Sequence, residues 1–182
     1  MPNDYEREFR HIDENWRTHN TYEARLRLAR QYAWAIPCDE ALEVIGRYGP
    51  IVEGGAGSGY WAKLLRDQGV DVVAYDAAPY ENHWVSARWT EVLVGDHEAM
   101  AQHKDRALLL IWPPYDEPMG LDHIKAHGGT TVILVGEGPH GCTGDRDMHK
   151  YLEEHFEERE SVDIPQWESI HDWLRVYVRK VK

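Results

Sequence analysis

The chain has 182 residues, of which 42% are hydrophobic, and its formal net charge is -12 at pH 7. This length suits one domain, and the acidic balance argues against duplex DNA as a partner, because phosphate backbones are bound through clustered Lys and Arg. No apolar run approaches the roughly 20 residues that cross a bilayer, so we expect no membrane partner.

The composition also bears on the compartment. The two cysteines, Cys38 and Cys142, lie far apart and form no CxxC pair, so we expect no disulfide framework. The histidines lack the ligand spacing of a metal site, and we predict no bound metal. No basic start followed by an apolar stretch marks a secretory signal. A reducing, cytoplasmic location fits these features.

The first 49 residues are predicted to form a helical cap. Residues 1–20 are polar and weakly patterned, so we expect loose or partly helical structure there. Apolar residues recur at helical spacing over residues 21–35, and Asp39 can cap a second helix over residues 40–47. These two short helices precede the first strand, so we expect them at the edge of the sheet or over the mouth of a site.

From residue 50 onwards, short apolar runs alternate with helical patterns. This alternation predicts an α/β core over residues 50–182, a doubly wound and mainly parallel sheet of seven strands, in one domain with the cap. The last two strands are expected to pair antiparallel, and the acidic segment 153–160 is expected to be an exposed helix surface. The predicted strands span residues 50–53, 70–75, 90–94, 107–112, 130–136, 161–164 and 174–179, and the predicted core helices span residues 60–67, 121–126 and 145–157.

The most informative segment is a glycine-rich turn after the first predicted strand. Residues 53–59 read E-G-G-A-G-S-G, and glycines let a backbone approach a ligand where a Cβ would collide. The second predicted strand leads to Asp76, a carboxylate that can accept hydrogen bonds from two ribose hydroxyls. This order of strand, turn, helix, strand and acid indicates a site for an adenosine-containing cofactor. A tight strand-to-helix turn without a ligand is the alternative.

The spacing favours a cofactor other than a dinucleotide. A dinucleotide site has the pattern G-x-G-x-x-G, whereas here the third glycine comes one residue early, at Gly59. Glu53 stands two residues before the first glycine of the pattern, Gly55. A carboxylate there is a poor neighbour for a pyrophosphate but a good one for a ligand with an ammonium and a sulfonium, such as S-adenosylmethionine (SAM).

The pattern E-x-G-x-G-x-G resembles motif I of the class I SAM-dependent methyltransferases, which have a Rossmann-like fold. The resemblance spans about residues 50–180 and implies SAM as cofactor and S-adenosylhomocysteine (SAH) as product. Gly95-Asp96 is similar to motif III, in which an acid accepts from the adenine amino group; Asp96 as a turn acid that caps a helix remains open. His97 either stacks on adenine or is a surface residue. The cofactor-binding residues expected at this site are Glu53, Gly55, Ala56, Gly57, Gly59, Asp76, Asp96, His97 and Trp112.

A second motif follows the fourth predicted strand, at Trp112-Pro113-Pro114-Tyr115. The prolines hold the backbone extended and leave carbonyl oxygens free to accept from a substrate amine, beside a ring that can stack. The element resembles motif IV of amino-methyltransferases, (Asp/Asn/Ser)-Pro-Pro-(Tyr/Phe/Trp), which methylate exocyclic nitrogens such as adenine N6. Trp112 departs from this pattern because an indole only donates, so either Asp116 or another acid replaces it, or the acceptor is not an adenine. A strand end that forms a rigid cofactor wall is the alternative.

Two later loops carry further candidates. In the glycine-rich loop after the fifth predicted strand, Glu137 or His140 is a candidate general base or acceptor-orienting group, with a surface turn as the alternative. Several of the eight tryptophans are expected in the core, and some in a cleft that holds a flat ligand. The last connection offers three residues that line the acceptor site or close a corner of the core, namely Trp167, His171 and Asp172.

The function expected from these residues is methyl transfer from SAM to a nitrogen, or another nucleophile, of a nucleobase or small molecule. Such a transfer mainly needs alignment of the acceptor and the methyl group. The catalytic candidates are Pro113, Tyr115 and Asp116, and the expected partner is a small-molecule or nucleotide acceptor. Because Trp112 replaces a polar residue, a SAM-binding module that senses the cofactor or supports a catalytic partner, without transferring methyl, is the alternative.

Overall fold

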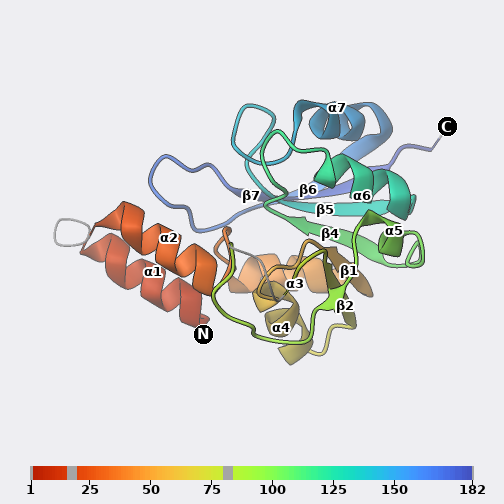
Figure 1. Cartoon of the computed structure of the whole chain (residues 1–182). Coiled ribbons are helices and arrows are strands. Elements are labelled where there is room, and N and C mark those ends of the chain that lie inside the picture. The colour runs from red at the N-terminus through yellow and green to blue at the C-terminus, as the bar shows by residue number, and fades with distance from the viewer. Residues whose placement is uncertain (1, 16–19, 80–83, 182) are drawn as a thin grey trace.

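The computed structural model describes residues 2–15, 20–79 and 84–181. These residues form a seven-stranded sheet with the strand order β3-β2-β1-β4-β5-β7-β6 (Figure 1). The strands are β1 Ile51–Gly54, β2 Val72–Asp76, β3 Leu93–Val94, β4 Ala107–Ile111, β5 Thr131–Gly136, β6 Phe156–Asp163 and β7 Trp173–Arg179. The helices are α1 Asp4–Glu14, α2 Thr21–Gln31, α3 Asp39–Arg47, α4 Tyr60–Asp67, α5 His97–Met100, α6 Met119–His127 and α7 Arg146–His155.

The strand directions and order identify where a ligand can bind. The first five strands are parallel, and β7 runs antiparallel to both of its neighbours, β5 and β6. Along the chain, the sheet grows outward from β1 through β2 to β3 and then resumes on the other side of β1 with β4. In open α/β sheets ligands bind outside the carboxyl ends of the strands at such a switch point.

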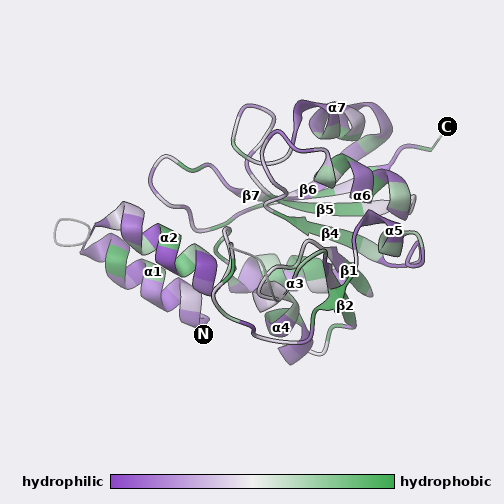
Figure 2. Cartoon of the chain, in the orientation of Figure 1, coloured by the Kyte–Doolittle hydropathy of each residue, from purple (hydrophilic) through white to green (hydrophobic). Residues whose placement is uncertain are grey.

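The sheet separates two apolar layers. Ile51 of β1 belongs to the cluster with α3 and α4, whereas the next residue, Val52, belongs to the cluster with α5, α6 and α7. This alternation follows from the pleat, which points successive side chains to opposite faces. Figure 1 shows the same two helix layers, and Figure 2 shows hydrophobic colour along the central strands with polar colour on the outer helix faces.

The α1–α2 pair forms a third packing unit beside the carboxyl end of the sheet (Figure 1). Its aromatic centre is a stack in which Tyr32 lies between Tyr5 and Trp89, with ring centroids 5.1 Å apart on each side. The indole of Trp167 donates to the hydroxyl of Tyr5 over 3.2 Å. The first and last parts of the described chain therefore pack together, and the corner-closing role is the one that the structure gives Trp167.

The predicted architecture is confirmed, including the antiparallel last pair, but some elements differ. Three helices precede β1 instead of two, because Tyr5, Phe9 and Ile12 bury one face of an otherwise polar segment. The helix predicted from residue 145 ends at His155, and residues 156–163 form an edge strand. Glu157 and Glu158 are exposed while Phe156 is buried, a pattern that suits an edge strand, where charge blocks unwanted pairing.

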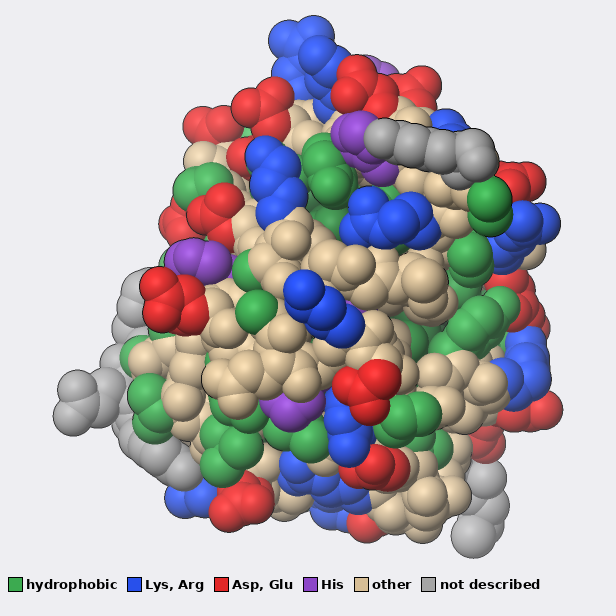
Figure 3. Space-filling model, turned by 90° about the vertical axis from the view of Figure 1, so that its right-hand side faces the viewer, with side chains coloured by type: hydrophobic (Ala, Val, Ile, Leu, Met, Phe, Trp, Pro, Cys, Tyr) green, Lys and Arg blue, Asp and Glu red, His purple; other side chains and the backbone are tan. Residues whose placement is uncertain are grey.

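The surface seen from the side opposite the α1–α2 pair has a mixed charge. Lys, Arg, Asp and Glu side chains intermingle over this face (Figure 3). Among the described residues, no helix combines the length and the apolar character that spanning a bilayer requires.

Candidate functional site

A cavity of about 740 Å³ opens at the carboxyl ends of β1, β2 and β4. Its walls come from the turn after β1, the ends of β2 and β4, the start of α6 and the end of α2. Most of the predicted site residues therefore meet in one place, although they are spread over more than 60 positions. The predicted residues that line the cavity are Glu53, Gly55, Ala56, Gly57, Asp76, Asp96, His97, Trp112, Pro113 and Tyr115. Gly59 and Asp116 are not among the described lining residues.

The glycine turn has the backbone that its sequence predicts. Gly55, Gly57 and Gly59 have φ values of 68°, 52° and 73°, in the left-handed region that favours glycine. Gly59 is the N-cap residue of α4, and a Cβ there would lie 2.8 Å from Val92 Cγ2 and 3.0 Å from Thr90 Cγ2. Gly59 thus packs against the segment before β3. This packing leaves no room for a Cβ and explains why the position is a glycine, with no contact to a cofactor required.

Asp76 ties the end of β2 to this turn. Its Oδ2 accepts from the backbone N–H of Gly57 and its Oδ1 from that of Ala78, both over 2.9 Å. The side chain is 7% exposed and lines the cavity. Since each carboxylate oxygen has two lone pairs, both oxygens retain accepting capacity toward a ligand.

Glu53 is the most unusual group in the cavity wall. It is 2% exposed, and its Oε2 is buried without a hydrogen-bond partner among the described residues. Burial raises the pKa of this carboxyl to about 8, and the charge of Asp76 adds to the rise, while Arg66 and the N–H of Ala62 oppose it. A buried carboxylate oxygen without a donor is unfavourable in the free protein, so a cationic donor placed in the cavity would satisfy it.

Asp96 and His97 lie at the far end of the same wall. Asp96 caps α5, with Oδ1 accepting from the N–H of Glu98 over 2.9 Å, so the helix-capping reading is confirmed while the residue also lines the cavity. The ring of His97 lies edge-on to that of His123, with centroids 6.3 Å apart. His123 also lines the cavity, and its burial lowers the pKa, so this imidazole is neutral at pH 7.

Trp112 occupies the first position of the proline motif in a strained backbone, with φ at 50°. Its N–H donates to the carbonyl of Val135 over 2.8 Å, and its indole Nε1 donates to Oδ1 of Asp172, also over 2.8 Å. Asp172 is 2% exposed and is not among the described lining residues. Burial raises the pKa of Asp172 to about 7, with a further rise from Glu137, against the lowering by the indole N–H.

The rest of the proline motif is only partly available to a ligand. The carbonyl of Pro113 accepts from the N–H of Gly144 over 2.8 Å, so the prediction of a wholly free carbonyl is wrong, because this bond fixes the glycine-rich loop. Tyr115 lines the cavity and is 65% exposed. Asp116 has φ at 56°, and its N–H donates to the carbonyl of Gly144 over 3.3 Å.

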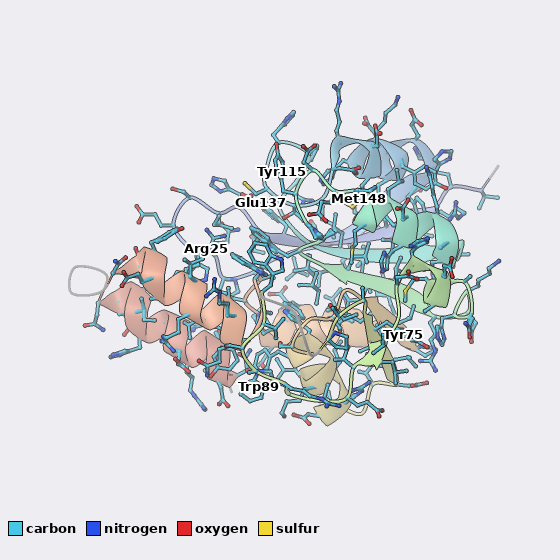
Figure 4. All side chains as sticks on the ribbon, in the orientation of Figure 1. Arg25, Tyr75, Trp89, Tyr115, Glu137 and Met148 are labelled. Atoms are coloured by element: carbon cyan, nitrogen blue, oxygen red, sulfur yellow. The ribbon has the colours of Figure 1, made fainter. Side chains whose placement is uncertain are left out.

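Glu137 is a structural group. Its Oε2 accepts from the N–H of Cys142 over 2.7 Å and its Oε1 from the N–H of His171 over 2.9 Å. The carboxylate thus joins the two loops after β5 and before β7, and neither it nor His140 is among the described residues that line the cavity. Figure 4 shows Glu137, Tyr115 and Arg25 at the same end of the sheet, on three different elements.

Sequence reasoning missed three lining residues, which come from the cap, from the segment after β2 and from α6. Trp34 and Trp84 line it, and the ring of Trp34 stacks on Trp112 with centroids 5.4 Å apart at 21°. Met119 also lines it and lies over Gly55, where a Cβ would be 2.3 Å from Met119 Cε. The only sequence signal for these residues was the high number of tryptophans, which does not reveal which of them meet.

Comparisons with known proteins support the fold. No protein-family model and no curated protein matches the chain. A solved structure of 1,6-didemethyltoxoflavin-N1-methyltransferase from Burkholderia thailandensis, with bound 1,6-didemethyltoxoflavin and SAH, is 14% identical, covers 95% of this chain and 86% of that chain, and has a TM-score of 0.53. A Streptococcus pneumoniae protein provisionally named as a tRNA methyltransferase is 13% identical, covers 80% of this chain and 72% of that chain, and has a TM-score of 0.50. The chain therefore has the Rossmann-like fold of the SAM-dependent methyltransferases.

Proposed function

We propose that the chain is a methyltransferase that uses SAM as its methyl donor. The observation that carries this proposal is the buried Oε2 of Glu53 in the cavity wall, which has no hydrogen-bond partner among the described residues. Asp76, the carboxylate that would accept from the ribose hydroxyls, follows 23 positions later. The two groups end neighbouring parallel strands, β1 and β2, on either side of the glycine turn. An anionic pocket beside a ribose acceptor suits a nucleoside that carries an ammonium.

The chemistry of Glu53 discriminates between cofactors. An ammonium would donate to Oε2 and stabilise the ionised carboxylate, and hydrogen bonds of this charge-assisted kind are about twice as strong as neutral ones. A pyrophosphate in the same place would keep the Glu53 carboxyl from ionising and would find no Lys or Arg among the described lining residues. The residues present therefore fit SAM and do not fit a dinucleotide.

The remaining lining residues divide the cofactor between them. Asp76 would accept from the ribose hydroxyls through its unused lone pairs, and Asp96 would accept from the adenine amino group through the oxygen that does not cap α5. Gly55 and Gly57 would let the backbone approach the methionine part. SAM, when bound, supplies an electrophilic methyl group on a sulfonium. The chain's own task is then to hold an acceptor against that methyl and to exclude water.

Tyr115 and the proline backbone remain the acceptor-side candidates. Tyr115 is exposed and borders the cavity, so its ring is free to rearrange around an acceptor. The backbone N–H of Asp116 donates to the carbonyl of Gly144, and we assign this residue a turn-forming role. The alternative of a silent binding module depended on Trp112, and the bond from Trp112 to Asp172 gives this residue a structural reason that is compatible with turnover.

The first test is calorimetric binding of SAM and SAH to the wild type and to Glu53→Gln. Loss of the charge-assisted bond is expected to lower the affinity for SAM by about tenfold or more. Glu43→Gln is the matched control, since Glu43 is exposed on α3 and is not a lining residue. Equal SAM affinity in the wild type and Glu53→Gln would contradict the assignment.

The second test is turnover. Methyl-tritiated SAM is incubated with the protein and separated pools of RNA, DNA, protein and small metabolites. The proposal that the chain is an enzyme is supported if the wild type labels a pool and Glu53→Gln labels it less. SAM binding without label in any pool would favour the silent module.

A further inference from the structure

We propose that the methyl acceptor is a planar heteroaromatic amine without phosphate or any other anionic group, held by the tryptophan wall (Trp34, Trp84 and Trp112). The inference rests on the proposed function and names its substrate class. Two independent properties of the cavity carry it, the shape of its aromatic side and the sign of its charge.

The tryptophan wall offers ring surface to the cavity. All three residues line it; the ring of Trp34 stacks on Trp112 at 5.4 Å and meets Trp84 edge-on at 5.8 Å. The hydrogen-bonding end of Trp112 is already occupied by Asp172. What this indole can give a ligand is therefore its edge and the face that Trp34 does not cover, which suit a flat ring system.

The wall is built with support from outside the cavity. The guanidinium carbon of Arg25 lies 5.6 Å from the ring centroids of both Trp34 and Trp112, and Arg25 is not among the described lining residues. Arg25 and Asp172 thus fix the two rings without entering the site. Trp84 is 49% exposed and borders the cavity.

The charge of the cavity excludes an anionic acceptor. The described lining residues include five carboxylates and neither Lys nor Arg. Of the two lining histidines, His123 is neutral at pH 7 because burial lowers its pKa. After SAM takes Glu53, Asp76 and Asp96 as partners, two carboxylates remain, at Glu117 and Asp122. A phosphate placed beside them would be repelled and would find no Lys or Arg among the described lining residues.

The same carboxylates favour an amine as nucleophile. The acceptor nitrogen would use its lone pair to form the N–CH₃ bond while the S–CH₃ bond breaks and its electron pair stays on sulfur, which becomes neutral. The nitrogen gains positive charge as it is alkylated and then releases its N–H proton to water. Fixed negative charge in the wall stabilises the cation as it develops, whereas an anionic nucleophile would gain nothing from it.

The test is calorimetric titration of the SAH-bound protein with pairs of probes that differ by one anionic group. The pairs are adenosine and AMP, cytidine and CMP, and aminoquinoline and aminoquinolinecarboxylate. We expect at least one uncharged or cationic member to bind, with its anionic counterpart about tenfold weaker or more. Trp34→Ala and Trp84→Ala are expected to weaken that ligand by about tenfold or more while SAH affinity changes by less than about threefold.

The variants separate a wall contact from a folding defect. Trp84→Ala alters a half-exposed ring and should leave the fold intact, and Tyr22→Ala removes an exposed aromatic of α2 that does not line the cavity. Tyr22→Ala is expected to bind probes and SAH as the wild type does.

Four results would overturn the inference. The first two are tighter or equal binding of the anionic probes, and binding of none of the planar amines by a protein that binds SAH. The other two are unchanged probe affinity in both tryptophan variants, and methyl label found in RNA. Failure of SAH itself to bind would contradict the proposed function first, so the two failures are distinguishable.

Discussion

The indole Nε1 of Trp112 donates to Oδ1 of Asp172 over 2.8 Å, across 60 positions of sequence. This bond joins the end of β4 to the start of β7 and fixes one ring of the tryptophan wall. The donor-only side chain of Trp112 therefore turns its polar group toward the protein, while its ring lines the cavity.

Removal of the Asp172 carboxyl, which accepts the hydrogen bond from Trp112, is expected to destabilise the fold. Asp172→Ala leaves the buried indole N–H without a partner, which should lower the free energy of unfolding by about 1–3 kcal/mol. Asp172→Asn keeps an accepting oxygen and should lose less. Urea unfolding at pH 6 compares the two variants, and an equal loss in both would show that the hydrogen bond is not what Asp172 contributes.

Glu53 is expected to make the stability of the free protein fall as pH rises. Its folded pKa of about 8 lies above the ordinary value of 4.5, so between these values the unfolded chain has released a proton that the folded chain retains. The free energy of unfolding therefore decreases with rising pH over this window. Glu53→Gln removes the decrease. Urea melts without SAM measure the free energy of unfolding of the variant and of the wild type. The value for the variant minus that for the wild type should rise by a few kcal/mol between pH 5 and pH 9. A difference that stays constant over this range would contradict the assignment.

Gly59 and Gly69 provide a matched pair for the glycine turn. Both have positive φ, at 73° and 82°, but a Cβ on Gly59 would meet Val92 and Thr90, whereas a Cβ on Gly69 has no atom within 4 Å. Gly69→Ala should cost about 1–2 kcal/mol from backbone strain alone. Gly59→Ala should cost roughly 1–3 kcal/mol more because of overpacking. Thermal or urea melts measure both, and equal losses would show that the Val92 contact is unimportant.

Ser58 links the glycine turn to the cap. Its hydroxyl donates to the carbonyl of Tyr32 and accepts from the N–H of Tyr60. Ser58→Ala is expected to lower the free energy of unfolding by about 1–3 kcal/mol and the affinity for SAM by a few-fold, since the turn loses its hydrogen bond to the end of α2. Ser161→Ala, at an exposed position of β6, is the control. An unchanged SAM affinity together with unchanged stability would count against this link.

The fold was largely predictable because its signals are local. Alternation of apolar runs and helical patterns identified the strands of a doubly wound sheet, and positions such as Gly57 and Asp76 followed from the order of strand, turn and acid. The edge strand β6 was not predictable in full. The polar run 157–160 has the composition of an exposed helix surface, and only its pairing with β7 makes it a strand.

The sequence predicted which residues of β1 and β2 line the cavity, and it predicted the lining from the cap and from the loops after β4 much less well. Glu53 and Asp76 each end a strand, so local sequence fixes where they point. Trp34 reaches the cavity only because the cap packs against the sheet, and the Pro113 carbonyl is occupied by Gly144 across 31 positions. Such long-range contacts leave no periodic trace in a sequence.

The bond between the Trp167 indole and the Tyr5 hydroxyl spans 162 positions and lies in the cluster that holds α2 against the glycine turn. Because α2 supplies part of the cavity wall, the binding pocket requires contacts between residues from opposite ends of the described chain. Occupancy of the pocket therefore stabilises the long-range closure of the polypeptide as well as the loops that touch the ligand, and the energy of ligand binding is coupled to the cooperative folding of cap and sheet together.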